Sequence, residues 1–166
     1  LAIRSACKQS HIPFDEQSDV LTSASCVKLV AALQKARASQ QEIAVLHILC
    51  HGGQAGSTFG LLLNGEEPGE SEVVDAGTLR QVLAPFADMV RLIVLSACDS
   101  GNTGPLGNQL GSVAQTLHRA GFACVVASRN PLAVTASIKL TETLYQQLLQ
   151  ETQSVEHSLM TVRNRL

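Results

Sequence analysis

The sequence predicts an α/β fold in which a mostly parallel sheet is flanked by helices on both faces. Three continuous apolar runs have the length of strands: residues 43–50 (IAVLHILC), 92–97 (LIVLSA) and 122–128 (FACVVAS). Such runs are typical of central strands that are covered on both sides. Segments with helical periodicity separate them along the chain, and this alternation favours a parallel sheet with right-handed crossovers.

Length and composition limit the classes of protein that fit. With 166 residues the chain is expected to form one domain, since a domain takes roughly 150 residues. The net charge of -2 and the lack of any Lys or Arg run argue against direct binding of nucleic acid. No apolar stretch approaches the roughly 20 residues of a membrane span. We therefore expect a soluble, cytoplasmic domain that binds neither nucleic acid nor membrane.

The cysteines indicate a reducing compartment. Their odd number and irregular spacing do not fit a disulfide framework, and we expect buried, reduced thiols. The five cysteines are Cys7, Cys26, Cys50, Cys98 and Cys124. The chain begins at Leu1 rather than at Met, so residues 1–166 are interpreted as one domain from a longer chain.

The residues before the first strand predict a helix, and the pattern at the N-terminal end of the chain is weaker. From Ser23, which we interpret as an N-cap, apolar residues recur at helical spacing to about residue 38. Residues 3–7 are expected to be helical, and residues 12–14 (IPF) to form an edge strand. The helix that begins at Ser23 leads into the strand at 43–50, which is expected to end there.

A glycine-rich segment follows that strand. The apolar run 59–63 (FGLLL) and the turn signal Asn64-Gly65 predict a hairpin, or a flap, beside the strand ends. Asp75 is expected to cap a short helix, which Pro85 ends.

The second half of the chain alternates between helices and strands. Apolar residues at i, i+3, i+4 and i+7 predict a helix over 110–117, and Gly121 closes it. After the strand at 122–128, a helix is expected over 135–150. Ser154 is expected to cap a final helix.

Cys98 and His51 follow two of the apolar runs. Parallel neighbours end at the same edge of a sheet, and open α/β sheets place their sites at the carboxyl ends of strands. A nearby imidazole lowers the pKa of a thiol, so we expect Cys98 to be a nucleophile and His51 a general base and then an acid. The backbone N–H groups of Gly52 and Cys98 are the candidate donors to an oxyanion.

Several motifs together resemble a CHAT domain. These are LHILCHGG at 46–53, GLLL at 60–63, RLIVLSACDSG at 91–101, and RAGF followed by ACVVAS at 119–128, before a helix that carries Tyr145. CHAT domains are caspase-like domains of the caspase, separase and metacaspase superfamily, and in bacterial proteins they are often attached to TPR repeats.

The resemblance covers about residues 20–166 and implies a caspase-haemoglobinase fold and a function. The implied function is that of a cysteine endopeptidase with a His51–Cys98 dyad, with Gly52 near the oxyanion. Its implied partners are a protein or peptide substrate and TPR or other regulatory domains. Such domains usually carry further segments before the position of Leu1 and after the last helix.

The resemblance indicates the catalytic residues more clearly than the preferred P1 residue of the substrate. Metacaspases carry an acidic residue two positions before the cysteine, whereas this chain has Ser96, so a preference for a basic P1 residue is not implied. Residues 128–131 (SRNP) are similar to the caspase loop whose arginine binds a P1 aspartate. Arg129 is therefore a candidate for that contact, since a guanidinium binds a carboxylate through two parallel hydrogen bonds, with an ordinary exposed arginine as the alternative. Ser96 is a candidate for substrate contact too, and the others are Asp99, Asp75 and Glu72.

Three alternatives remain open. The first is a catalytically idle CHAT domain that acts as a regulatory or protein-interaction module. The second is a flavodoxin-like phosphate or nucleotide binder at the loop 100–104 (SGNTG), although the G-x-G-x-x-G spacing and the Walker lysine are absent. The third is a metal site of His47, Cys50, His51 and Cys98, in which Cys50 points away from the two histidines. We expect neither a metal nor a cofactor, and we interpret His47 as a core or interface histidine with its hydrogen bonds satisfied.

Overall fold

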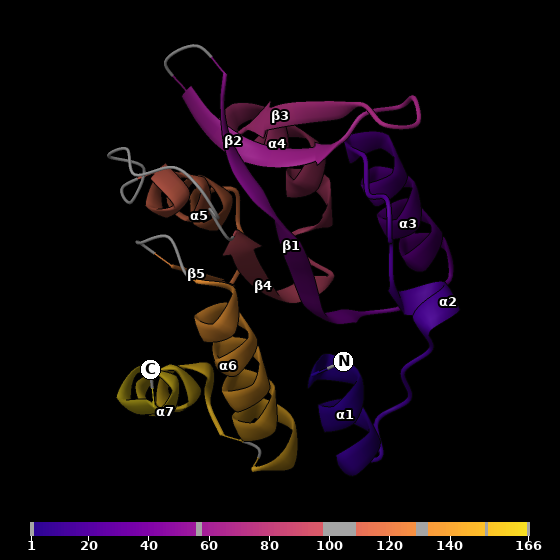
Figure 1. The fold of residues 1–166 in the computed structure, drawn as a ribbon. Helices are drawn as coiled ribbons and strands as arrows, with labels where there is room; N and C mark the ends of the chain where they lie inside the picture. Colours follow the sequence, from indigo (N-terminus) through magenta and orange to yellow (C-terminus); the bar gives the residue numbers. More distant parts are fainter. Residues whose placement is uncertain (1, 56–57, 98–108, 129–132, 152, 166) are drawn as a thin grey trace. The chain divides into compact units, whose positions relative to one another are not determined.

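The structure is a computed structural model that describes residues 2–55, 58–97, 109–128, 133–151 and 153–165. The chain divides into two compact units (Figure 1). The larger unit consists of Leu21–Leu132, and the smaller unit consists of Leu1–Val20 together with Ala133–Leu166.

The larger unit is built on a mixed sheet. In the described part of the chain this sheet has five strands, in the order β3-β2-β1-β4-β5 (Figure 1). The strands are β1 (Ile43–Ala55), β2 (Thr58–Asn64), β3 (Ser71–Asp75), β4 (Val90–Ala97) and β5 (Cys124–Ala127). Strands β1, β4 and β5 are parallel, whereas β2 is antiparallel to both β1 and β3. The predicted α/β fold, with the apolar runs as parallel neighbours, is confirmed.

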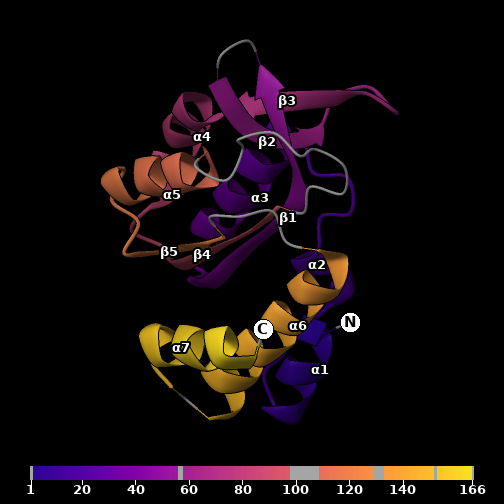
Figure 2. The ribbon, with the colours of Figure 1, turned by 60° about the vertical axis from the view of Figure 1, so that its left-hand side comes forward.

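Three helices of the larger unit share one apolar cluster with the sheet. They are α3 (Cys26–Ala38), α4 (Ala76–Leu83) and α5 (Gln109–Arg119), and Figure 2 shows them from a second side. Alternate strand residues point to one face, which explains why Ile93, Leu95 and Ala97 of β4 join the cluster. The members from these helices, β1 and β4 include Leu29, Leu33, Leu79, Leu83, Val113, Leu117, Ile48, Ile93, Leu95 and Ala97.

Helix α3 begins two residues later than the sequence predicts. Its N-cap is Ser25, whose Oγ accepts a hydrogen bond from the backbone N–H of Lys28 at 3.2 Å. The Ser25 side chain is fully buried, whereas Ser23 is exposed. The prediction of Ser23 as the cap is therefore wrong, because both serines suit a cap and only packing distinguishes them.

The predicted hairpin is confirmed as β2 and β3, but the strand before it is longer than expected. The expectation that this strand ends at Cys50 is wrong, since β1 continues to Ala55 and pairs with β2. Gly60 of β2 is needed for close approach to β3, because a Cβ there would lie 2.1 Å from the carbonyl oxygen of Val74. The hairpin is thus part of the sheet and not a separate flap.

Helix α5 ends as predicted. Gly121 adopts a φ of +106°, its N–H donates to the carbonyl of His118 at 3.0 Å, and the N–H of Phe122 donates to the carbonyl of Leu117 at 3.4 Å. This pair of hydrogen bonds is the Schellman arrangement that closes many helices. Helix α3 ends in the same way, with Gln40 at a φ of 54° where glycine is usual.

The smaller unit is helical in its described part. It contains α1 (Ala2–Gln9), α2 (Glu16–Asp19), α6 (Val134–Tyr145), the π-helical turn η3 (Gln146–Gln150) and α7 (Val155–Arg165). The helix expected over 135–150 is therefore α6 followed by η3. Ser154 caps α7 as predicted, because its Oγ accepts a hydrogen bond from the N–H of His157 at 3.2 Å.

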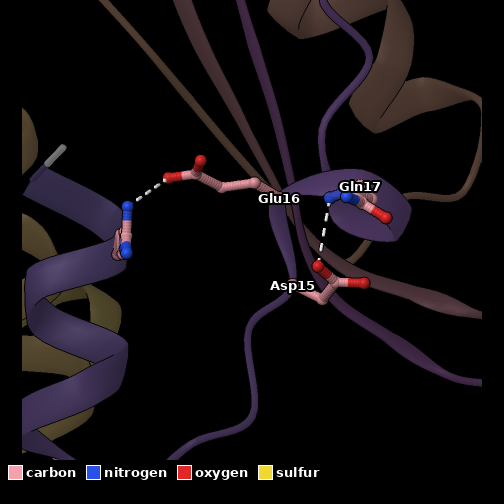
Figure 3. Close-up of polar contacts among 4 residues, drawn as sticks. Asp15, Glu16 and Gln17 are labelled. Atoms are coloured by element: carbon pink, nitrogen blue, oxygen red, sulfur yellow. Dashed lines mark hydrogen bonds and ion pairs between the residues drawn. The ribbon is translucent and has the colours of Figure 1, made fainter.

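The N-terminal part of this unit differs from the prediction. Residues 12–14 form no strand, and Pro13 lacks the N–H that a strand would need at that position. The next element is α2, where Asp15 accepts a hydrogen bond from the N–H of Gln17 at 3.2 Å (Figure 3). Arg4 of α1 forms an ion pair with Glu16 at 3.0 Å, which ties α1 to α2. None of the described helices has the length and apolar character needed to cross a membrane.

Candidate active site at the end of the parallel strands

Strand β1 changes its partner at His51. The part before His51 runs parallel to β4, and the last pair of that ladder is Cys50 with Ala97. From His51 onward β1 pairs with β2, beginning opposite Leu62. His51 therefore directly follows the end of the parallel ladder. Cys98 follows Ala97 in the sequence and lies outside the described residues.

The side chains of β1 alternate between the two faces of the sheet. Ile48 belongs to the apolar cluster, and Cys50 packs against it. Leu49 and His51 alternate with these residues and so point to the opposite face, where both are exposed. Because Cys50 and His51 point to opposite faces, they do not converge on one metal ion. Within the described ranges, no group of three or more His, Cys, Asp or Glu residues is placed to hold a metal ion.

His47 and Ser96 connect β1 and β4 on the same face as His51. The His47 Nε2 atom lies 2.9 Å from the Ser96 Oγ atom, at hydrogen-bond distance. Ser96 is only 4% exposed. Burial lowers the pKa of His47 to about 4, so its imidazole is neutral at neutral pH. His47 is thus a hydrogen-bonded histidine, as the sequence predicts, and its partner Ser96 is a finding of the structure.

The hydrogen bond to His47 bears on the role predicted for Ser96. That role is contact with substrate, at the position where metacaspases carry an acid. In the structure the Ser96 hydroxyl meets an imidazole from the neighbouring strand, and its contact with substrate stays a prediction. The sequence does hold a signal for this pair, because His47 and Ser96 fall on the same face once the two runs are aligned as parallel neighbours.

Gly52, the candidate oxyanion donor, lies within β1 opposite Leu61. It is partly buried. Its neighbour Gly53 approaches β3 so closely that a Cβ there would lie 2.7 Å from the Val73 Cγ2 atom. Both glycines therefore belong to the strand, and the donor role of the Gly52 N–H stays a prediction.

The two described acidic candidates for substrate contact, Asp75 and Glu72, both lie in β3. Asp75 is the N-cap of α4, as predicted, and accepts hydrogen bonds from the N–H groups of Thr78 and Gly77 at 2.9 and 2.7 Å. These bonds, that of Thr78 first, hold the pKa of Asp75 below its usual range. Glu72 is an exposed residue of β3. Three further predictions lie outside the described residues, namely those on Asp99, on Arg129 and on the phosphate loop at 100–104.

Two described cysteines away from the strand ends have thiols whose pKa is raised. Burial raises the pKa of Cys7, with a further contribution from Asp19. The pKa of Cys26 is also raised, by burial first and then by Glu72 and Glu66. Since the thiolate is the reactive form, both are poor nucleophiles at neutral pH.

Comparisons with known proteins identify the family. A search of curated proteins returned no match for the chain. The family model of the CHAT domain matches residues 2–166, which is nearly the whole chain. The CHAT family has a caspase-like fold, and the mixed α/β architecture described above is consistent with that fold. The chain belongs to the CHAT domain family.

Proposed function

We propose that this chain is a cysteine endopeptidase in which Cys98 is the nucleophile and His51 the general base. The pairing of β1 with β4 is the observation that carries the proposal. Their ladder ends at the pair Cys50–Ala97, and the next residue along each strand is His51 and Cys98 respectively. If the register continues by one residue, the two residues become direct neighbours at the carboxyl end of the parallel strands, where sites of α/β sheets form.

Alternation gives the proposal a second support. His51 points to the face that also carries His47 and the Ser96 side chain. Cys98 is two residues beyond Ser96, and residues two apart on a strand share a face. The thiol and the imidazole are thereby expected on the same face of the sheet, which is the condition for proton transfer between them.

The chemistry follows from this pairing. His51 takes the proton of the Cys98 thiol, and the thiolate attacks the carbonyl carbon of the peptide bond to give a tetrahedral oxyanion. The N–H groups of Gly52 and Cys98 are the proposed donors to that oxygen. When the C–N bond breaks, the protonated His51 gives its proton to the leaving amine, and an acyl-enzyme thioester remains. Water, deprotonated by His51, then attacks the thioester and restores the thiol.

The test is covalent labelling with a mixture of peptidyl acyloxymethyl ketones that differ in their P1 residue. The wild type is expected to be labelled on the peptide that contains Cys98, as located by mass spectrometry. Labelling should be lost in Cys98→Ala and should fall at least about a hundredfold in His51→Ala, because a general base contributes about that much or more. Cys26→Ala is the matched control, since it removes a thiol whose pKa is raised.

Equal labelling of wild type, Cys98→Ala and His51→Ala, or labelling of none of them, would refute the peptidase proposal. That result would favour the alternative of an idle domain with a regulatory or interaction role. The P1 residues of the probes that react would also test Arg129, which we propose as the residue that binds an acidic P1 side chain. Arg129→Glu should then abolish reaction with probes that have aspartate at P1.

A further inference from the structure

Leu49 is an unusual residue for a central strand. It lies in the part of β1 that pairs with β4, opposite Ser96, yet its side chain is 71% exposed. Among the strand residues whose burial the structure describes, it is the one large apolar side chain that is exposed. Most of the apolar surface of Leu49 is thus in contact with water and is available to a ligand.

The surroundings of Leu49 place it beside the proposed dyad. His51 lies two residues further along the same strand and on the same face, about 7 Å away for extended backbone. Ser96, its partner across the ladder, lies two residues before Cys98. A peptide whose scissile bond reaches His51 and Cys98 therefore has a side chain within reach of Leu49.

Two described neighbours of Leu49 on this face, His47 and Ser96, carry no charge at neutral pH. Burial keeps the His47 imidazole neutral, and its Nε2 atom meets the Ser96 hydroxyl. In the β4 ladder next to them, Val94 is 1% exposed and apolar. A charged substrate side chain that settled here would lose water without finding an opposite charge from Leu49, His47 or Ser96.

We propose that Leu49 forms an apolar subsite next to the scissile bond and gives the enzyme a preference for a peptide with an aliphatic or aromatic side chain at one position flanking that bond. This inference rests on the proposed peptidase function and adds the chemical class of its substrate. Leu49 acts by binding and takes no part in the transfer of protons. Because its side chain is largely exposed, its replacement is compatible with folding.

The experiment is a profile of cleavage by wild type, Leu49→Ala and Leu49→Arg, using a peptide library randomised at the positions on both sides of the scissile bond. The wild type is expected to select apolar residues at one position. In Leu49→Ala, kcat/KM for the best apolar peptide should fall about tenfold, chiefly through KM, as expected for the loss of an apolar contact. In Leu49→Arg, selection at the same position should shift to Asp and Glu.

The matched control is Val27→Arg. Val27 is 61% exposed on α3, whose Leu29 and Leu33 pack into the cluster on the opposite face of the sheet, so this variant adds the same charge away from the site. Its cleavage profile should equal that of the wild type. Profiles of both Leu49 variants that match the wild type, with cleavage still dependent on Cys98, would overturn the subsite alone. No Cys98-dependent cleavage by the wild type would overturn the peptidase function, and the subsite with it.

Discussion

The stability of the larger unit should decrease in mild acid because of His47. Its imidazole lies between β1 and β4, with Nε2 2.9 Å from the Ser96 Oγ atom, and burial lowers its pKa from 6.5 to about 4. The unfolded chain then binds a proton at this residue more readily than the folded protein does. The free energy of unfolding is therefore unaffected by His47 above about pH 6.5 and falls as the pH decreases from there to about 4.

The size of the effect follows from the two pKa values. Proton linkage with pKa values of 6.5 and about 4 gives a loss of about 2.5 kcal/mol between about pH 7.5 and pH 4.5. This is a large share of the roughly 5–15 kcal/mol that stabilises a typical domain. It should be visible as a lower midpoint of urea denaturation.

The variant His47→Gln isolates this contribution from the carboxylates that titrate in the same range. Glutamine retains an amide that can hydrogen-bond to Ser96 but does not titrate. Urea denaturation followed by circular dichroism gives the free energy of unfolding of both proteins at each pH. The difference between wild type and variant should change by about 2.5 kcal/mol from about pH 7.5 to pH 4.5. A difference that stays constant over this range would refute the argument from burial.

Four further substitutions test the packing and backbone of the larger unit. Gly60→Ala should cost about 3 kcal/mol, because the new Cβ would lie 2.1 Å from the Val74 carbonyl oxygen, and a loss below about 1 kcal/mol in urea denaturation would contradict this. Gly53→Ala should lower the free energy of unfolding by less, about 1–2 kcal/mol, because the new Cβ meets the Val73 side chain. Adding Val73→Ala should remove this clash and recover part of the loss. If the effects of the two substitutions on the free energy of unfolding are strictly additive, the contact is contradicted. Gln40→Gly should stabilise the protein by about 0.5–1 kcal/mol, because Gln40 has a φ of 54°, which glycine adopts without strain. The melting temperature should rise by a few degrees, and a lower melting temperature would contradict this prediction.

The parts of the fold that could be predicted are those that local pattern determines. Runs such as IAVLHILC and RLIVLSA indicate central strands because strands covered on both faces are apolar at nearly every residue. Gly121 could be assigned because a helix that ends in a left-handed residue favours glycine. Asp75 could be assigned because its carboxylate suits the free N–H groups at the start of a helix.

The wrong predictions concern elements and element boundaries that depend on tertiary contacts. The predicted end of β1 at Cys50 is too early, because His51-Gly52-Gly53 contains glycines, which strands disfavour, and only pairing with β2 makes this segment extended. Ser23 and Ser25 are equally good caps in isolation, and the choice between them depends on where Leu29 meets the core. The edge strand expected at 12–14 was wrong because three apolar or neutral residues carry little information without a partner strand.

In the candidate site, too, some features follow from the local sequence pattern and others depend on tertiary contacts. The position of His51 at the end of the parallel ladder could be predicted from the two apolar runs, because parallel neighbours end together. The bond between His47 and Ser96 depends on the register of β1 against β4, which the sequence leaves open. The exposure of Leu49 could not be predicted either, because an apolar residue inside an apolar run is normally buried.

Two glycines, one in β1 and one in β2, allow the strands beside His51 to pack closely. Gly53 of β1 pairs with Gly60 of β2, and Gly60 in turn pairs with Asp75 of β3, so the two glycines lie side by side where β3 comes closest. A slip of one residue between β2 and β3 would bring Leu61 into the place of Gly60, where a Cβ meets the backbone of β3. A slip of one residue in β1 would likewise turn His51 toward the apolar cluster, since alternate residues face opposite sides. The close packing at Gly60 therefore fixes the register of β2 against β3, and the pairing of β1 with β4 and β2 keeps the imidazole of His51 on the face that the dyad requires.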